Sequence, residues 1–439
     1  MLILKGGTVL TYLNNGKFYC EKTDVLIKDT KIKKIGKNLQ KEFKDAIIEN
    51  VEDKYIIPGF VQSHIHLCQV LFKGSADDME LMDWLEKRIW PLEAMHTAES
   101  ISISAKMGIA ELMSGGTTTV VDMGTIRHTE YIAEELVNSG IRAFFGKTMM
   151  DRKGLPDFLK EDTQKSIEDS LDLYNKYHGK GDGRIKYAFA PRFAVSCTDE
   201  LLKQVSDICK DKGLLFHTHA SENKKEIELV KELTGMKNIE YFEKKEIAGE
   251  NLLLAHCVWV DDEEREILKK YNIKVIHCPS ANMKLASGIA PIPKYLKDKI
   301  TVGLGADGAP CNNNLSMFKE MKLAALIQKP FHGPTCMNAG EAFKMATLGG
   351  AKVVGMENEI GSIEEGKKAD IVILDLEKIN SSPYFDPVSS IVYSAAFSNV
   401  DKVFIDGKVV YNNGKHLTIN TEHLVKDANV ILRDFMVKL

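Results

Sequence analysis

Eight short apolar segments, each separated from the next by an amphipathic stretch, limit the fold of this 439-residue chain more than any other feature. Short segments that are apolar on both faces are typical of strands in a parallel sheet, and the stretches between them have helical spacing. Eight alternating strand and helix units predict a TIM-like (β/α)8 barrel of the α/β class over residues 59–354. The predicted strands are residues 56–66, 117–124, 141–150, 185–193, 214–220, 251–259, 274–280 and 301–308.

The two ends of the chain predict a second, smaller unit built from β-hairpins. Residues 24–32 and 402–410 each place a tight turn that begins with aspartate between two apolar strands. Because both ends have this pattern and the length favours more than one domain, we expect the termini to pair. The predicted segments are 1–58 for the N-terminal part of a small β-sandwich, 59–354 for the barrel, and 355–439 for the C-terminal part of the sandwich with a terminal helix.

Charge and composition narrow the class of partner. Lys and Arg number 58 against 62 Asp and Glu, and no basic run occurs, so nucleic acid is not an expected partner. The first ten residues form too short an apolar run for a signal peptide or a membrane span, so no membrane contact is expected. The eight cysteines include no C-x-x-C pair, which suits free thiols in a cytoplasmic protein and disfavours a thiolate metal site.

Polar residues at the carboxyl ends of the predicted strands indicate where chemistry takes place. In a barrel these ends meet at one mouth, where the active sites of barrel enzymes lie. His64 and His66 are two residues apart on one strand and so share a face, and a buried imidazole is costly without a partner. His217 shares a face with His219 and is expected to have a structural role. The polar residues at the strand ends are His64, His66, Asp122, Lys147, Arg192, His217, His219, His256, His277 and Asp307.

Four of these residues predict a metal site. His64 and His66 from the first strand, His219 from the fifth and Asp307 from the eighth supply three imidazoles and one carboxylate. This set leaves a coordination position for water, which is typical of a catalytic rather than a structural site. The donors suit a borderline divalent ion, with Zn²⁺ ranked first and Fe²⁺ or Mn²⁺ as alternatives.

The segments around these residues resemble the amidohydrolase superfamily. The resemblance rests on PGFVQSHIH, on HTHASEN with its three-residue step from His219 to Glu222, on LAHCVW and on GLGADGAPCNNN. Residues 66–93 and 277–293 further resemble the branch of nucleoside and nucleobase deaminases that act on 5′-deoxyadenosine, methylthioadenosine and S-adenosylhomocysteine. The resemblance spans nearly the whole chain. It implies a metal-dependent aminohydrolase with a small purine nucleoside as substrate, assembled as a homo-oligomer.

The resemblance also implies one ion and a division of the proton steps. Binuclear relatives have a carboxylated lysine at the end of the fourth strand, whereas here Lys186 lies near its start and Arg192 at its end. Asp307 is expected to accept a proton from a water whose pKa the ion lowers, and His256 to hydrogen-bond that water. Glu222 is expected to protonate the ring nitrogen beside the attacked carbon and then to deliver a proton to ammonia.

Three further residues are expected to contact the substrate together with Glu222. Glu93 matches the acidic residue that binds the ribose hydroxyls in adenosyl-type relatives. Arg192 stands where many of these relatives have histidine, and guanine-type deaminases resemble the chain there and at Gln69. Adenine nucleosides therefore rank first, and deamination of guanine or 8-oxoguanine, or triazine hydrolysis, is the alternative. A non-catalytic relative would lack a ligand or the proton shuttle, and neither is missing from the sequence.

Overall fold

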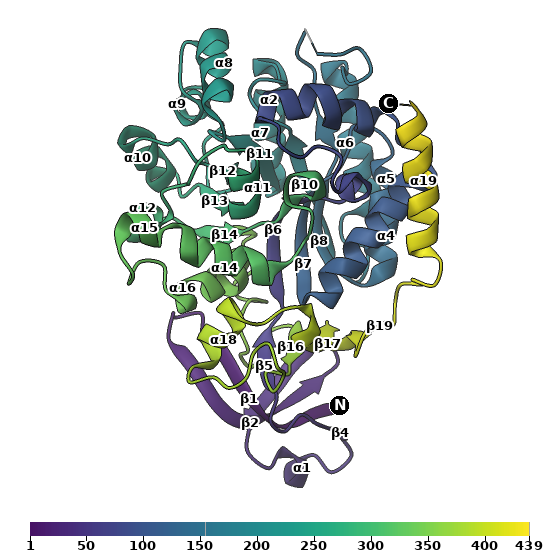
Figure 1. Cartoon of the computed structure of the whole chain (residues 1–439), viewed down its shortest axis with the longest axis vertical. Coiled ribbons are helices and arrows are strands. Elements are labelled where there is room, and N and C mark those ends of the chain that lie inside the picture. Colours follow the sequence, from purple (N-terminus) through teal and green to yellow (C-terminus); the bar gives the residue numbers. More distant parts are fainter. Residues whose placement is uncertain (154, 439) are drawn as a thin grey trace.

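Eight parallel strands form a closed barrel at the centre of the molecule (Figure 1). The computed structural model describes residues 1–153 and 155–438. In order around the barrel, the strands are β6 (Phe60–His66), β7 (Thr117–Met123), β8 (Arg142–Gly146), β10 (Ile185–Pro191), β11 (Leu215–Ala220), β12 (Leu252–His256), β13 (Lys274–His277) and β14 (Val302–Leu304). Pairing of β14 with β6 closes the ring, so the predicted (β/α)8 architecture is confirmed.

One glycine separates the barrel from the second sheet. The segment 56–66, expected as one strand, contains β5 (Tyr55–Pro58) of the second sheet and then β6 of the barrel. A Cβ on the intervening Gly59 would lie 2.1 Å from the hydroxyl oxygen of Thr118 on the neighbouring strand β7. The backbone can pass this close to Thr118 only with glycine at position 59. Two other predicted strands also divide, into β8 and β9 (Thr148–Met149) and into β14 and β15 (Asp307–Gly308).

Helices connect the strands; most of them cover the outer face of the barrel, and the first one lies beside the terminal sheet (Figure 1). They are α1 (Leu39–Glu42), α2 (Leu81–Trp84), α3 (Trp90–Ala94), α4 (Ala98–Ser114), α5 (Thr129–Ser139), α6 (Thr163–Tyr177), α7 (Asp199–Lys212), α8 (Lys224–Thr234), α9 (Asn238–Lys244), α10 (Asp262–Lys270), α11 (Pro279–Lys284), α12 (Ile292–Lys297), α13 (Ala309–Asn312), α14 (Met317–Ile327), α15 (Lys329–His332), α16 (Ala339–Lys344), α17 (Gly350–Val353), α18 (Pro387–Tyr393) and α19 (Leu424–Lys438). Thr97 and Thr198 cap α4 and α7, because their side chains accept N–H groups of the first turn. Within the described ranges, no helix has the length and apolar character that a membrane span requires.

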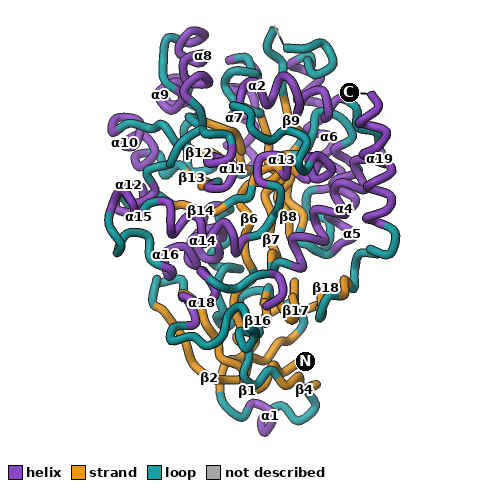
Figure 2. The backbone as a smooth tube through the Cα atoms, in the orientation of Figure 1, coloured by secondary structure: helices purple, strands orange, loops and turns teal. Residues whose placement is uncertain are grey.

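The two termini form one sheet of nine strands, as the hairpin patterns predict. Its order is β19-β18-β17-β16-β5-β1-β2-β3, with β4 paired to β1, and Figure 2 shows it below the barrel. Antiparallel pairing of β5 with β16 joins the N-terminal and C-terminal parts. The strands besides β5 are β1 (Leu2–Tyr12), β2 (Phe18–Lys28), β3 (Lys31–Gly36), β4 (Ile47–Asn50), β16 (Ile371–Leu374), β17 (Val400–Ile405), β18 (Lys408–Asn412) and β19 (Lys415–His416).

The terminal helix α19 packs against the barrel, beside α4 (Figure 1). The ring of Phe435 lies 5.5 Å from that of His96 and 6.1 Å from that of Phe72, measured between centroids. Phe72 ends the 3-10 turn Leu67–Phe72 that directly follows β6. The last helix therefore packs, on the outside of the barrel, against the 3-10 turn that directly follows His64 and His66.

Candidate active site

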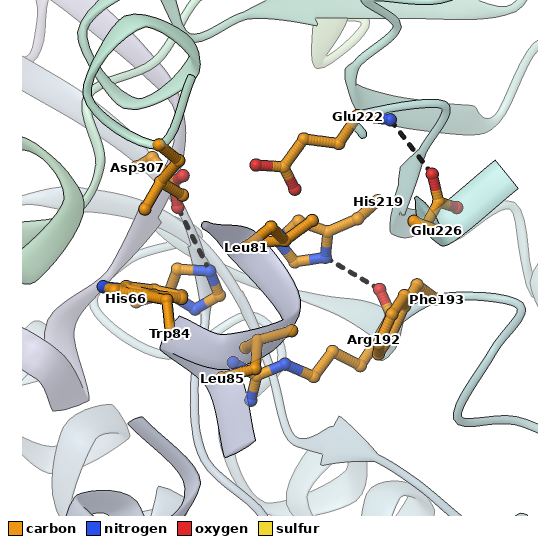
Figure 3. Close-up of a pocket in the computed structure, with 11 residues that line it drawn as sticks. His66, Leu81, Trp84, Leu85, Arg192, Phe193, His219, Glu222, Glu226 and Asp307 are labelled. Atoms are coloured by element: carbon orange, nitrogen blue, oxygen red, sulfur yellow. Dashed lines mark hydrogen bonds and ion pairs between the residues drawn. The ribbon is translucent and has the colours of Figure 1, made fainter. Parts of the chain in front are cut away.

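A pocket at the mouth of the barrel brings predicted site residues together under an apolar cover (Figure 3). His66, His219 and Asp307 line it from the ends of β6, β11 and β15. Arg192 and Glu222 line it from the loops after β10 and β11. The other lining residues are Leu81, Trp84, Leu85, Phe193, Glu226 and Leu285. The pocket thus forms where the carboxyl ends of the strands converge.

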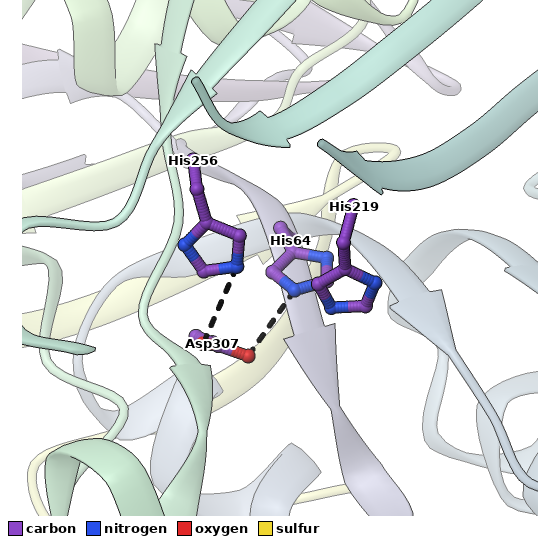
Figure 4. A group of neighbouring side chains, drawn as sticks. All are labelled: His64, His219, His256 and Asp307. Carbon is purple, nitrogen blue, oxygen red and sulfur yellow. Dashed lines mark hydrogen bonds and ion pairs between the residues drawn. The ribbon is translucent and has the colours of Figure 1, made fainter. Parts of the chain in front are cut away.

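Four donor groups on the floor of the mouth lie close enough to share one ion. A ring nitrogen each of His64, His219 and His256 and a carboxylate oxygen of Asp307 lie within 4.8 Å of one another (Figure 4). His64 Nε2 is 3.1 Å from Asp307 Oδ1. His66 adjoins the group, with its Nε2 3.4 Å from the same oxygen. The three predicted histidine ligands therefore lie around the Asp307 carboxylate, and His256, with its Nε2 3.8 Å from Asp307, lies beside them.

Hydrogen bonds on the far side of the rings fix how three of the imidazoles face this centre. Each Nδ1 meets an oxygen that only accepts, so Nδ1 carries a proton, and in the neutral ring the lone pair of Nε2 faces the centre. Metal-binding histidines are held in this way in proteins generally. The contacts are His66 Nδ1 to Met123 O at 2.8 Å, His219 Nδ1 to Arg192 O at 2.7 Å and His256 Nδ1 to Asn282 Oδ1 at 2.8 Å.

His64 is held by a second histidine. Its Nδ1 lies 2.8 Å from His217 Nε2, so His64 donates to His217 when its own Nε2 lone pair faces the centre. His217 is fully buried and does not line the pocket. This position behind a predicted ligand agrees with the structural role expected for His217.

Burial and close contacts determine the protonation states of the imidazoles and of the Asp307 carboxyl group at the bottom of the pocket. Burial lowers the pKa of the His66 imidazole to about 3 and that of His219 well below its usual value, so both rings are neutral at pH 7. Burial alone would raise the pKa of the Asp307 carboxyl, but the hydrogen bond from His64 and the surrounding imidazoles hold it well below its usual value. Neutral imidazoles around one buried carboxylate are a donor set that fits a borderline divalent ion.

His256 differs electrostatically from the other imidazoles. Burial opposes its protonation, yet the carboxylates of Glu222 and Asp307 raise its pKa above the usual value. Its Nε2 is 3.4 Å from Glu222 and 3.8 Å from Asp307, and it makes no hydrogen bond to any described residue. His256 therefore has a nitrogen available to a small polar molecule between the two carboxyl groups.

Glu222 is a buried carboxyl group at the edge of this centre. Burial raises its pKa to about 7, and the imidazole of His256 offsets part of that effect. Glu222 Oε2 faces His256, and Glu222 Oε1 accepts a hydrogen bond from the Ser287 hydroxyl at 3.4 Å. A carboxyl group with a pKa near neutrality can both give and take a proton at physiological pH.

The three remaining predicted contacts form one buried cluster. Gln69 Nε2 donates to Glu93 Oε1 at 2.7 Å, and Arg192 donates to Glu93 Oε2 at 2.9 Å. Each is at most 6 % exposed. Of the three, only Arg192 lines the pocket, so Glu93 and Gln69 lie behind it. Both oxygens of Glu93 thus already have a partner.

Sequence reasoning missed Glu226, which also lines the pocket. Its carboxylate accepts the backbone N–H of Glu222 at 3.1 Å and a second bond from the side-chain amide of Asn238. Burial raises its pKa to about 7. The spacing of four residues from Glu222, into the first turn of α8, is the signal that could have identified it.

Backbone strain is concentrated at the same place. His256 and Asp307 have φ values of 75° and 62°, and Ser221, directly before Glu222, has a φ of 53°. Residues other than glycine are uncommon in this left-handed region, and such strain often accompanies functional sites.

Comparison with known proteins agrees with this geometry. The amidohydrolase family model matches residues 55–410. The chain is 38% identical to 5′-deoxyadenosine deaminase of Methanobrevibacter smithii, covering 99% of this chain and 98% of that protein. It is 36% identical to 5-methylthioadenosine/S-adenosylhomocysteine deaminase of Carboxydothermus hydrogenoformans, covering 98% and 96%.

A solved structure extends the likeness to three dimensions. An adenosine deaminase from Xanthomonas campestris with bound zinc superimposes with a TM-score of 0.92 at 26% identity, over 100% of this chain and 99% of that one. The family match covers more than half of the sequence and includes every strand of the barrel. The chain belongs to the amidohydrolase family.

Proposed function

We propose that the protein is a metal-dependent aminohydrolase that replaces the 6-amino group of an adenine nucleoside with a carbonyl oxygen and releases ammonia. The names of the relatives support 5′-deoxyadenosine, methylthioadenosine and S-adenosylhomocysteine as substrates, with adenosine beside them. Glu222 carries the proposal, because a carbonyl substrate needs no proton donor for a ring nitrogen whereas a heteroaromatic amine does. We further propose a cytoplasmic homo-oligomer with no nucleic-acid or membrane partner.

The proposed ligands of a single divalent ion are His64, His66, His219 and Asp307. Neutral imidazoles with one ionised carboxylate support Zn²⁺ as the first choice, before Fe²⁺ and Mn²⁺. When bound, the ion supplies a Lewis acid that brings the pKa of a water molecule close to neutrality.

The proton steps are assigned to three side chains. His256 orients the attacking water through its free Nε2, and Asp307 accepts the proton that the water releases. Glu222 gives its proton to the ring nitrogen beside the attacked carbon, which compensates for the loss of aromaticity. As the bond to the amine breaks, Glu222 takes the proton of the newly formed hydroxyl group and passes it to the departing amine, for which a pKa of about 7 is well suited. The proton held by Asp307 then restores Glu222.

A second candidate is deamination of a guanine-type base on the same centre. The observation in its favour is the cluster behind the pocket, because both oxygens of Glu93 are bonded to Gln69 and Arg192. A carboxylate engaged in this way has less capacity left for two ribose hydroxyls. Arg192, which lines the pocket, offers donors to acceptor atoms of either purine.

Ammonia release separates the candidates. The zinc-reconstituted protein is assayed for ammonia with 5′-deoxyadenosine, methylthioadenosine, S-adenosylhomocysteine, adenosine and guanine, and for chloride with a chlorotriazine, whose hydrolysis releases that ion. We expect turnover of the adenine nucleosides; turnover of guanine or the triazine alone would refute the ranking. Metal analysis of the same sample tests the third possibility, since a non-catalytic relative would bind no zinc at a stoichiometric supply.

A further inference from the structure

The end of the barrel opposite the mouth contains a second cavity. Its volume is about 530 Å³, within the range of small-molecule pockets. Lys186, Leu215 and Lys274 line it from the first two residues of β10, β11 and β13, whereas the residues of the proposed active site lie at the other ends of the strands. Residues 352–355, which end α17 and follow it, form another wall.

Positive charge without partners is concentrated in this cavity. Four lysines line it against two glutamates, Glu250 and Glu357. Over the described residues, none of these six side chains forms an ion pair within 4.0 Å or a side-chain hydrogen bond. The four lysines are Lys186, Lys212, Lys274 and Lys352.

Lys274 shows most clearly that a buried ammonium group in this cavity lacks an ion-pair partner. It is only 9 % exposed, whereas the similarly buried Lys147 and Lys367 pair with Glu161 and Glu364. Burial lowers the pKa of the Lys274 ammonium group, and the charges of Glu250 and Glu357 offset this only in part. An ammonium group taken out of water needs a counter-charge, and none of the residues that the structure describes brings one within 4.0 Å of Lys274.

Lys186 and His178 place further donor groups in the wall of the cavity. Burial also lowers the pKa of Lys186, whose ammonium group lies 5.5 Å from the centre of the Phe144 ring in the cavity wall. His178 accepts the backbone N–H of Tyr187 on Nδ1 at 3.1 Å, so its neutral ring carries a proton on Nε2. The wall therefore offers ammonium groups and an imidazole donor but few acceptors for them.

We propose that this cavity is a second ligand site, at the base of the barrel, for a small and multiply charged anion bearing a phosphate group. Lys186 and Lys274 provide the inner charges, and Lys212 and Lys352 provide the charges at the rim. Lysine binds phosphate as a point charge with rotatable donors, so the site selects charge and size more than shape. Strand β11 reaches both sites, with Leu215 at the base and His219 at the mouth, but no residue lines both pockets.

Calorimetry on the full-length, zinc-loaded protein tests this proposal with two probes, inorganic phosphate and ribose 5-phosphate. We expect saturable binding of at least one probe with one site per chain. The paired substitution Lys186→Met and Lys274→Met should weaken that binding about tenfold or more. Tighter binding of ribose 5-phosphate would assign a sugar phosphate, and equal binding would assign the free anion. The matched control is Lys41→Met with Lys44→Met, which removes the same charge from two exposed lysines and should leave the affinity unchanged.

A second pair of variants guards against loss of folding. Lys212 is exposed and Lys352 half-exposed, so replacing both with methionine should leave the fold intact and weaken binding about threefold. The proposal is overturned if neither probe binds at concentrations up to about 10 mM. It is also overturned if both paired variants bind as tightly as the unaltered protein, because phosphate would then be held at the mouth or elsewhere.

Discussion

At the scale of single residues, the environment of Glu222 differs from that of every other acidic group at the mouth. It follows a left-handed residue, its backbone N–H is bonded to Glu226, and its carboxyl faces His256. Asp307 has an equally buried carboxyl group, but the neighbouring imidazoles lower its pKa and keep it ionised. The pKa of Glu222, in contrast, is raised to about 7. Two carboxyl groups with pKa values moved in opposite directions are what a proton-transfer site requires.

Replacing Glu222 with glutamine should abolish turnover without removing the ion. Glutamine keeps the size of the side chain but cannot exchange a proton, so kcat should fall about 10²- to 10⁴-fold. Zinc content should stay at the level of the unaltered protein, because Glu222 is not a proposed ligand. Glu228→Gln, an exposed position on the following helix α8, is the matched control. Retained turnover in the Glu222 variant would refute the shuttle role.

Glu226 should act through Glu222, as a positioning residue. Removing its carboxylate with Glu226→Ala frees the Glu222 backbone N–H and the Asn238 amide, so kcat should fall about tenfold with KM little changed. Glu226→Gln retains one acceptor oxygen and should restore most of the activity. Equal losses in both variants, or a change in KM alone, would contradict positioning. Kinetics with 5′-deoxyadenosine provide the measurement.

At the scale of elements, the segment Leu81–Ala94 covers the mouth. It combines α2, a π-helical turn over Leu85–Ile89 and α3, and π-turns often occur at functional positions. Leu81, Trp84 and Leu85 close the pocket, which holds about 30 Å³ of free space. That space admits about two water molecules and no purine ring. The cover must therefore move before a nucleoside can enter.

Fluorescence of Trp84 should report that movement. Trp84 is 4 % exposed, and the chain contains two other tryptophans, Trp90 and Trp259. In a variant with Trp90→Phe and Trp259→Phe, addition of a nucleoside product should change the intensity or wavelength of the remaining emission as the cover opens and closes. A variant that instead has Trp84→Phe should show a much smaller change. Unchanged emission during normal turnover would show that the cover stays still.

The elements also show how far sequence reasoning reaches. The eight strands were predictable because a strand buried on both faces displays its apolar run directly in the sequence. The division of 56–66 was not, because it depends on the contact between Gly59 and Thr118, which are far apart in the chain. Glu93, Gln69 and Arg192 were identified one by one from a resemblance. Their mutual bonding joins three separate elements, and no local pattern encodes it.

At the scale of the whole molecule, the proposed ion should stabilise the fold. It would neutralise a buried carboxylate and satisfy imidazole lone pairs that come from two different strands of the barrel, β6 and β11. A ligand at about 1,000 times its Kd stabilises the native state by about 4 kcal/mol. Removing the ion with a chelator should therefore lower the midpoint of thermal unfolding, and added zinc should restore it. In Asp307→Asn the chelator should have little effect; an unchanged midpoint in the unaltered protein would contradict a tightly held ion.

The barrel and the terminal sheet are joined through one buried arginine. Arg142, at the start of β8, donates to Asp370 at 2.8 Å and 3.0 Å and to Asp406 at 2.8 Å. Asp370 lies directly before β16, and Asp406 lies in the turn between β17 and β18. All three side chains are at most 3 % exposed. The guanidinium group thus satisfies two carboxylates that the terminal sheet buries against the base of the barrel.

Arg142→Met should destabilise the whole molecule while leaving the chemistry at the mouth intact. Methionine fills similar space but leaves two buried carboxylates without their main partner, and breaking a buried ion pair in this way costs about 3–5 kcal/mol. Urea unfolding followed by circular dichroism provides the measurement, with the exposed Arg433→Met as the control.

Adding Asp370→Asn and Asp406→Asn to Arg142→Met should recover part of the lost free energy of unfolding, because neutral amides are less costly to bury. The kcat of the folded variant should match that of the unaltered protein, since Arg142 lies at the opposite end of β8 from the mouth. A loss below about 1 kcal/mol would show that Lys368 and Arg184, which approach Asp406 at 3.4 Å and 4.0 Å, suffice to hold the sheet against the barrel.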